Sequence, residues 1–271
     1  MLISFITTIK ICKGYEWLMN SILLYIRNID YFCSQKHIEY EILICEQIDD
    51  KNIFNIQSQF DFSSFPNVKI IPLLQTYHNP FNFNLIEAYG KNKCLEEARG
   101  EYTCMTSADI LFDELFFDYL SSLQKNIFYR FATFEIPRKS FDNIKDALQY
   151  CKETTSKRLC NTGCFVEKPT PIQLAQKSGD IMLLDTLSFR KIKGWPETIC
   201  FTHMDMATCI VATNNFSFIV PNKEICTYTF TQEQRNSSIG EKYIRVNGNV
   251  VTLENFQFNM ALSFFHKKTS N

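Results

Sequence analysis

The chain has 271 residues, 45% of them hydrophobic, so it is long enough to bury a sizeable core. Its formal net charge is −1, and Lys and Arg form no run beyond the terminal His266-Lys267-Lys268, which argues against a nucleic-acid groove. The apolar run "WLMNSILLYI" is too short to span a bilayer and lacks the flanks of a signal peptide. Composition therefore predicts a folded protein without a transmembrane segment, located in the cytoplasm.

The eleven cysteines do not indicate a disulfide framework. Their number is odd, and Cys45, Cys104 and Cys209 lie inside apolar stretches, as buried free thiols do in a reducing compartment. Cys160 and Cys164 have near-ligand spacing, but no histidine lies close to them, so a structural zinc site is not favoured. We interpret both as structural residues.

Strand-like and helix-like segments alternate along the chain. The first half predicts strands and helices in this order: strand 2–8, helix 15–29, strands 40–46 and 68–74, helix 83–98 and strand 101–106. The second half is less regular and predicts strands at 126–136, 180–185 and 216–221, with helices near 142–155 and 205–213. Strands that alternate with helices indicate βαβ units, an α/β fold and a parallel sheet. No repeat or hinge indicates a domain boundary.

Polar residues follow three of the predicted strands. They are Thr7-Thr8, Glu46-Gln47 and Ser107-Ala108-Asp109, and the carboxyl ends of parallel strands share one edge where ligands bind. The chain has eight glycines and neither GxGxxG nor GxSxG, and Gly90-Lys91 lacks the upstream glycine of a P-loop. A glycine-cradled phosphate and a serine hydrolase are therefore both disfavoured.

Asp109 is the most informative single acid. A carboxylate at the end of a buried strand commonly holds Mg²⁺ or Mn²⁺ against substrate phosphates. The alternative is that Asp109 caps a following helix, for which Asp113-Glu114 would suit the first turn. The residues around Asp109 leave both interpretations open.

A succession of motifs resembles a known family. The segments "YEILICEQ", "GKNKCLEEARGEYTCMTSADILF", "SGDIMLLDTLSFRKIKGWPE" and "THMDM" are similar to nucleotide-sugar glycosyltransferases of the GT-A fold, especially the inverting group of family two. The resemblance covers residues 2–231. It implies a Rossmann-like GT-A fold with a mostly parallel central sheet flanked by helices. It also implies a single domain, 1–271, with a nucleotide-sugar-binding half (1–125), an acceptor half (126–231) and a C-terminal extension (232–271).

The resemblance assigns donor-binding roles to residues of the first half. The backbone of Thr7 and Thr8 would pass beside the nucleotide, and Glu46 would contact the base or the ribose. Lys91 and Asn92 match the Arg-Asn pair of the family, so a cation there would approach the donor pyrophosphate. The alternative for Lys91 is a solvated helix residue, because lysines are mostly exposed.

The resemblance also implies a metal site. Asp109 matches the second acid of the DxD-type signature and would bind Mn²⁺ or Mg²⁺, whereas Ser107 replaces the first acid. A hydroxyl can hydrogen-bond ribose or a metal-bound water but supplies no charge, so we expect weaker metal binding than in a full DxD site. The late histidine that many relatives use as a metal ligand is absent from 226–234, and His266 lies too near the end to be compared.

The acceptor site is expected in the second half. Gly179 and Asp180 resemble the start of the acceptor-site strand, and Trp195 and Glu197 belong to a "GWPE" loop that would close over the sugar. Trp195 would stack on an apolar sugar face, or alternatively serve as a packing anchor.

Asp205 matches the general base of the family. It would take the proton of the acceptor hydroxyl, and His203 would orient it or bind substrate. The alternatives are a partly exposed turn histidine at position 203 and a helix N-cap at position 205.

The implied activity is transfer of a hexosyl or N-acetylhexosaminyl group from a nucleotide-sugar donor, with UDP-sugar preferred, to a glycan or another hydroxyl acceptor. We expect the reaction to depend on metal and to invert the anomeric carbon. Two alternatives come from other classes. A non-catalytic nucleotide-sugar-binding protein would explain the missing first acid, and a nucleotidyltransferase would share the sheet, although "TTIKICKG" is poor in the glycines of such enzymes.

Overall fold

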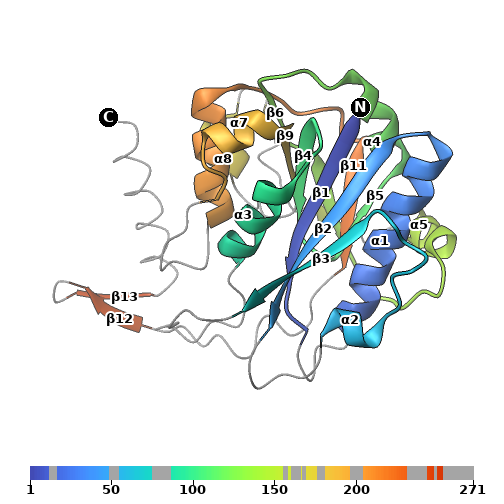
Figure 1. The fold of residues 1–271 in the computed structure, drawn as a ribbon. Helices are drawn as coiled ribbons and strands as arrows, with labels where there is room; N and C mark the ends of the chain where they lie inside the picture. Colours follow the sequence, from blue (N-terminus) through green and yellow to red (C-terminus); the bar gives the residue numbers. More distant parts are fainter. Residues whose placement is uncertain are drawn as a thin grey trace.

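The structure is a computed structural model. It describes residues 1–11, 17–48, 55–74, 87–154, 158–159, 166, 169–175, 181–195, 204–230, 243–246 and 249–252. Figure 1 shows a central twisted sheet with helices on both of its faces, as expected for an α/β fold.

The central sheet has seven strands in the order β10-β6-β9-β4-β1-β2-β3. The strands are β1 (Leu2–Ile9), β2 (Glu39–Ile48), β3 (Val68–Leu74), β4 (Tyr102–Thr106), β6 (Ile127–Tyr129), β9 (Ile181–Asp185) and β10 (Ser217–Ile219). Neighbouring strands are parallel except that β9 runs antiparallel to both β4 and β6. The predicted mostly parallel sheet is confirmed.

Each face of this sheet has its own hydrophobic core, because successive strand residues point to opposite sides. Phe5 belongs to one core and Ile6, the next residue, to the other. Figure 1 shows α1 (Trp17–Gln35) on the Phe5 side. Several helices cover the Ile6 side. These are α3 (Glu87–Glu97), α6 (Pro171–Ala175), α7 (Thr186–Lys191) and α8 (Met204–Asn215).

A smaller sheet completes the core on the α1 side. Its strands, in spatial order, are β5 (Ile110–Phe112), β11 (Cys226–Phe230), β7 (Ala132–Ile136) and β8 (Arg158–Leu159). The helices α4 (Glu114–Tyr119), η1 (Leu120–Ser122) and α5 (Ile144–Glu153) pack with it. The remaining elements are α2 (Ile56–Gln59) and the hairpin strands β12 (Tyr243–Val246) and β13 (Asn249–Thr252).

The structure corrects two expectations. The segment 126–136 is not one strand: β6 pairs with β9 in the central sheet, and β7 pairs with β11 in the smaller one. Asp109 does not cap a helix, because strand β5 follows it and Asp113 is the N-cap of α4, accepting a hydrogen bond from Leu115 N at 3.1 Å. The capping alternative for Asp109 is therefore wrong.

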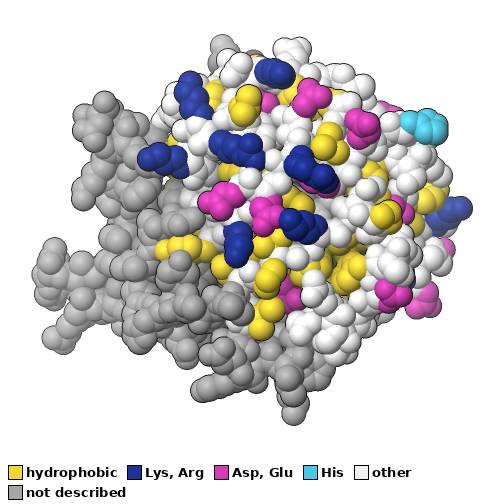
Figure 2. Space-filling view, viewed as in Figure 1, with side chains coloured by type: hydrophobic (Ala, Val, Ile, Leu, Met, Phe, Trp, Pro, Cys, Tyr) yellow, Lys and Arg dark blue, Asp and Glu magenta, His cyan; other side chains and the backbone are white. Residues whose placement is uncertain are grey.

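Cysteines and surface charge are distributed as follows. The cysteines at 33, 45, 94, 104, 151, 209 and 226 are buried and free, and Cys160 and Cys164 lie outside the described residues. On the face shown in Figure 2, basic and acidic side chains are interspersed. Lys69 pairs with Glu97. Among the described residues, no helix is both long and apolar enough to cross a membrane.

Candidate active site

The strand register brings the expected donor residues to one edge of the central sheet. Thr8 lies beside Cys45 and Ile9 beside Glu46, so β1 and β2 end together. Ile6 lies beside Met105, which places the end of β4, and Ser107 after it, at the same edge. The predicted shared edge therefore exists, because the parallel pairings of β1 with β2 and with β4 keep the carboxyl ends of these three strands level.

Asp109 is buried just beyond the end of β4, with 6% of its surface exposed. Thr229 Oγ1 donates a hydrogen bond to its Oδ2 at 3.2 Å. Thr229 is on β11, where it pairs antiparallel with Ile110, the residue after Asp109. Sequence reasoning missed Thr229. The alternating Thr227 and Thr229 indicate one face of a strand, but nothing local shows that this strand pairs with β5.

A buried asparagine holds the backbone that follows Asp109. Asn28, on α1, donates from Nδ2 to Phe112 O at 3.1 Å and accepts from Phe112 N at its Oδ1 at 2.7 Å. The Phe112 ring lies 5.5 Å from the Phe5 ring, centroid to centroid, in an edge-on arrangement. Because both backbone groups of Phe112 are bound, β5 is fixed against α1, and the chain leaving Asp109 has a fixed direction.

The end of β1 is tied to its neighbours by two threonine side chains. Thr7 Oγ1 donates to Thr106 O at 3.0 Å, which links β1 to β4. Thr8 Oγ1 donates to Glu87 O at 3.3 Å, which links β1 to the first turn of α3. A Cβ added to Gly90 would lie 2.4 Å from Thr8 Cγ2, so only glycine permits this close approach of α3.

Glu46 is a buried carboxyl at the end of β2. Its Oε1 accepts a hydrogen bond from Ile56 N, at the start of α2, at 2.6 Å. Burial raises the pKa of Glu46 to about 7, and the Ile56 N–H opposes this by stabilising the carboxylate. The Glu46 carboxyl therefore changes its charge near neutral pH.

Lys91 is fully buried, so the alternative of a solvated helix lysine is wrong. Its Nζ lies 2.6 Å from Glu87 Oε1, one turn earlier on α3, and 4.0 Å from the centroid of the Trp195 ring. A carboxylate and an aromatic face both stabilise a desolvated ammonium. The cation expected near the donor is thus held between α3 and the segment that follows α7.

Asn92 binds the backbone of Trp195 with both ends of its amide. Asn92 Nδ2 donates to Trp195 O at 2.7 Å, and Trp195 N donates to Asn92 Oδ1 at 2.8 Å. Trp195 is only 2% exposed and belongs to the core on the α3 side. In this structure Trp195 is therefore a packing anchor, and its ring is not presented to an acceptor sugar.

Asp205, the expected general base, has a partly exposed side chain. It lies inside the first turn of α8, which begins at Met204, so it is not an N-cap. Cys209 and Ile210, further along α8, are buried and Met206 is partly buried, as their spacing predicts. Gly179, Asp180, Glu197 and His203 lie outside the described residues.

The donor atoms near Asp109 suit a hard cation held mainly by its substrate. Within the described part of the chain, no group of three or more His, Cys, Asp and Glu side chains forms a metal cage. Asp109 supplies one carboxylate. Ser107, two residues earlier in the chain, supplies a hydroxyl, and Thr229, which is hydrogen-bonded to Asp109, supplies another. Mg²⁺ and Mn²⁺ accept such oxygen-only sets, with one carboxylate and substrate phosphates completing the shell.

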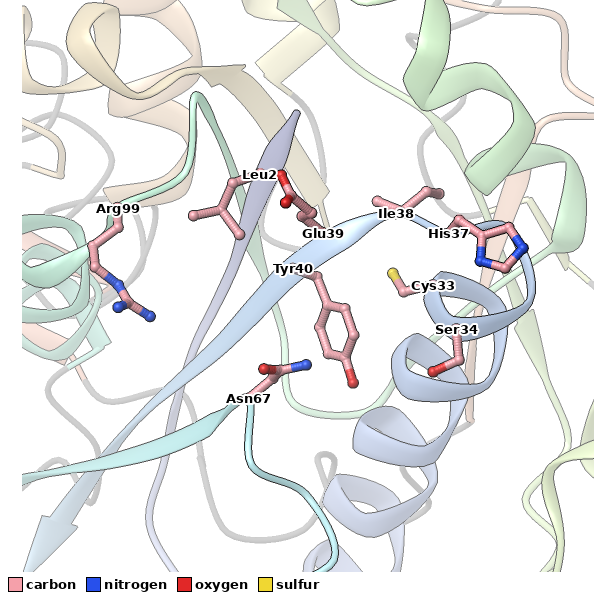
Figure 3. Close-up of a pocket in the computed structure, with 9 residues that line it drawn as sticks. All are labelled: Leu2, Cys33, Ser34, His37, Ile38, Glu39, Tyr40, Asn67 and Arg99. Atoms are coloured by element: carbon pink, nitrogen blue, oxygen red, sulfur yellow. The ribbon is translucent and has the colours of Figure 1, made fainter.

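A surface cavity of about 670 Å³ lies at the opposite edge of the sheet (Figure 3). It is lined by residues at the amino-terminal starts of β1 and β2, including Leu2, Glu39 and Tyr40, together with Arg99. Asp109 follows the carboxyl end of β4, so this cavity is separate from the candidate site.

Comparison with known proteins identifies the fold. No family model and no curated protein matches the chain. It is similar to S. aureus TarS in complex with UDP-GlcNAc, with 13% identity and a TM-score of 0.59 over 86% of this chain and 59% of that one. It is also similar to the mannosyltransferase PcManGT from Pyrobaculum calidifontis in complex with GDP-Man and Mn²⁺, with 14% identity and a TM-score of 0.50 over 86% and 58%.

A further TarS structure, in complex with UDP, matches with 15% identity and a TM-score of 0.53 over 85% of this chain and 61% of that one. The chain spans about three fifths of the length of these structures. The likeness shows that this protein has the GT-A fold.

Proposed function

We propose that this protein is a glycosyltransferase that moves a sugar from a nucleoside-diphosphate-sugar, with UDP-sugar preferred, to an acceptor hydroxyl. One observation carries the proposal: Asp109 is buried directly beyond β4, at the edge where β1 and β2 also end, in a GT-A fold. Solved structures with this fold were obtained with UDP-GlcNAc and with GDP-Man and Mn²⁺, which supports a nucleotide-sugar as the donor.

Donor recognition would use the residues that line this edge. Glu46 would accept hydrogen bonds from the ribose or the base, and the backbone at Thr8 would run beside the nucleotide. Lys91 would face the diphosphate, because its ammonium is fixed and desolvated, which strengthens attraction to an anion.

Asp109 would hold Mn²⁺ or Mg²⁺, with Thr229 orienting its carboxylate by a hydrogen bond and Ser107 supplying a hydroxyl. The cation, when bound, would stabilise the negative charge that develops on the departing nucleoside diphosphate. With a single carboxylate at the site, we expect the cation to bind together with the donor and weakly without it.

Asp205 would act as the general base for the acceptor hydroxyl. Its position in the first turn of α8 leaves it partly exposed while Cys209 and Ile210 anchor the helix in the core. The acceptor oxygen would attack the anomeric carbon from the side opposite the departing nucleoside diphosphate while its proton passes to Asp205, and such a single displacement would invert the configuration. The replacement of the first acid by Ser107 favours one alternative, a protein that binds nucleotide-sugars without transferring them.

A thermal-shift experiment tests donor binding. UDP-, GDP-, CMP- and dTDP-sugars are added with and without Mn²⁺, and one donor is expected to raise the melting temperature only with metal. At about 100 times Kd, binding adds about 2.7 kcal/mol to the free energy of unfolding, which is a rise of about 5–10 °C for a domain of this size.

Variants assign that rise to the site. Asp109→Ala should abolish its metal-dependent part, whereas Ser107→Ala should reduce it modestly. Asp142→Ala, at an exposed position before α5, is the matched control and should leave the rise unchanged. If no nucleoside diphosphate or its sugar shifts the melting temperature with metal present, the donor site does not exist. Binding without transfer to any acceptor would support the non-catalytic alternative.

A further inference from the structure

Helix α3 and the segment after α7 are joined at one point by an unusually specific contact. The Asn92 amide binds both the N–H and the carbonyl of Trp195, at 2.8 and 2.7 Å. Gly194, the preceding residue, has φ +60, a conformation that L side chains rarely adopt. A Cβ at Gly194 would lie 2.3 Å from Asn92 Oδ1. Glycine at position 194 therefore allows the contact with Asn92 in two ways: it adopts the positive φ, and it has no Cβ to collide with the Asn92 amide.

The contact sets the position of the Trp195 ring. Asn92 and Lys91 are consecutive on α3, and the ring that Asn92 holds by its backbone lies 4.0 Å from Lys91 Nζ. On the other side of the ammonium, Glu87 Oε1 lies 2.6 Å from Lys91 Nζ. Lys91 is thus confined by its own helix on one side and by a residue 104 positions later on the other.

Two buried donors meet at this place. Within the described residues, the buried Trp195 Nε1 makes no hydrogen bond, and the buried Lys91 Nζ has the Glu87 carboxylate at 2.6 Å but no well-aligned hydrogen bond. Buried donors are normally satisfied, so the unpaired indole N–H needs an explanation, and an acceptor on a bound ligand supplies one. Phosphate oxygens are strong acceptors and match the positive charge of Lys91.

We propose that Asn92 is a positioning residue, which locks Trp195 over Lys91 so that the ammonium and the indole N–H are held ready for the diphosphate of the donor. The proposal rests on the proposed function for the identity of the anion. It changes the role that sequence motifs suggest for Asn92: this side chain acts through Trp195 and Lys91 and does not itself bind the donor.

The first experiment measures the lock without any ligand. Trp17 and Trp195 are the two tryptophans of the chain, so Trp17→Phe leaves Trp195 as the only indole fluorophore. In that background, Asn92→Ala and Gly194→Ala should shift the emission to longer wavelength and raise quenching by acrylamide about twofold, because a released ring becomes more accessible. Asn92→Asp keeps the acceptor for Trp195 N and loses the donor, and should give an intermediate value. Asn214→Ala, at an exposed position on α8, is the control.

The second experiment measures donor affinity in a double-mutant cycle. Asn92→Ala and Lys91→Met are each expected to weaken donor binding about tenfold, and the double variant should bind no more weakly than Lys91→Met alone. Lys93→Met is the matched control, because Lys93 lies on the same helix and makes an exposed bond to Pro72 O. Turnover at saturating donor should fall less than affinity does.

The outcomes are distinguishable. Unchanged emission and quenching in Asn92→Ala and Gly194→Ala would overturn the lock, even if a donor binds. Additive losses in the cycle would show that Asn92 does not act through Lys91. Absence of any nucleotide-sugar binding to the wild type would overturn the proposed function and the role in donor binding, while the fluorescence would still decide whether Asn92 holds Trp195. Circular dichroism melts identify a variant that has not folded, and Asn92→Asp then provides the measurement.

Discussion

Asn28 and Asn92 perform the same task at two places in the candidate site. Each uses the donor and the acceptor of one amide to bind both backbone groups of a single residue, Phe112 or Trp195. Removing either amide would leave two backbone groups of a buried segment unsatisfied, each at a cost of about 1–3 kcal/mol. Such side chains bind backbone groups that no neighbouring strand binds: Phe112 lies on β5, the edge strand of the smaller sheet, and Trp195 lies in the segment after α7.

Glu46 carries a prediction about pH. Burial disfavours its charged form and raises its pKa to about 7, so the neutral acid predominates at pH 6 and the carboxylate at pH 8. If the carboxylate accepts hydrogen bonds from the ribose or base, donor affinity should fall by up to about tenfold per pH unit below this pKa. Glu46→Gln should bind the donor more weakly above pH 7 and lose the pH dependence.

Thermal melts of the same two proteins check the pKa itself. A carboxyl whose folded pKa is raised from 4.5 to about 7 makes the folded state less stable as pH rises through that interval. Wild type should therefore lose stability from pH 5 to pH 8 relative to Glu46→Gln. A parallel pH dependence of the two melts would show that Glu46 is ionised throughout.

The sequence identified candidate site residues where a motif contains them. It did not identify residues that reach the site from a distant part of the chain. Glu46, Lys91 and Asp109 follow from their places in the chain. Thr229 lies 120 residues from Asp109, and Trp195 lies 103 residues from Asn92, so both contacts depend on tertiary pairing. That pairing was not visible in local periodicity, and for the same reason the sequence left open whether Lys91 is solvated.

At the scale of elements, alternation of apolar and polar residues predicted β1, β2, β3 and β4 to within two residues and located α1 and α3. It failed at 126–136, where apolar residues continue through the point at which the chain leaves the central sheet for the smaller one. Hydrophobic pattern reports burial and does not report which sheet a strand joins. The antiparallel direction of β9 was equally inaccessible.

Replacing Gly90 of helix α3 by alanine should change stability in the opposite direction from the usual effect of this substitution in a helix. Glycine to alanine inside a helix normally stabilises by up to about 1 kcal/mol. Gly90→Ala should instead lower the free energy of unfolding by about 1–3 kcal/mol, because its Cβ would lie 2.4 Å from Thr8 Cγ2 and 2.5 Å from Thr8 Oγ1. The helix has little freedom to retreat, since Arg190 binds the carbonyls of Leu95 and Ala98 at its other end.

Denaturant titration of Gly90→Ala measures this loss, and Thr8→Ala in the same chain is the compensating change. Removing the Thr8 side-chain atoms should restore part of the stability despite losing the hydrogen bond to Glu87 O. A stabilised Gly90→Ala would mean that α3 can move away from β1 without loss, and that the contact between them does not fix Lys91.

At the scale of the molecule, the candidate site joins distant parts of the chain. The division into a donor half, 1–125, and an acceptor half, 126–231, stays a prediction. Two of the contacts that cross it lie at the candidate site: Thr229 of β11 binds Asp109, and Asn92 of α3 binds Trp195. Because the smaller sheet and the segment after α7 complete the environment of donor residues, we expect the second half to be required for donor binding as well as for acceptor binding.

Asp205 tests whether donor binding and chemistry are separate in the whole protein. Asp205→Asn keeps the size of the side chain but cannot take a proton, so donor affinity should stay within a few-fold of wild type while turnover falls by about 10² or more. Stability should fall by at most about 1 kcal/mol, because Asp205 lies in the first turn of α8, where a negative charge interacts favourably with the helix dipole. Donor titration, thermal melting and turnover on this variant distinguish three roles. Retained turnover would remove Asp205 from the mechanism, lost donor binding would move it to the metal site, and a large loss of stability would make it structural.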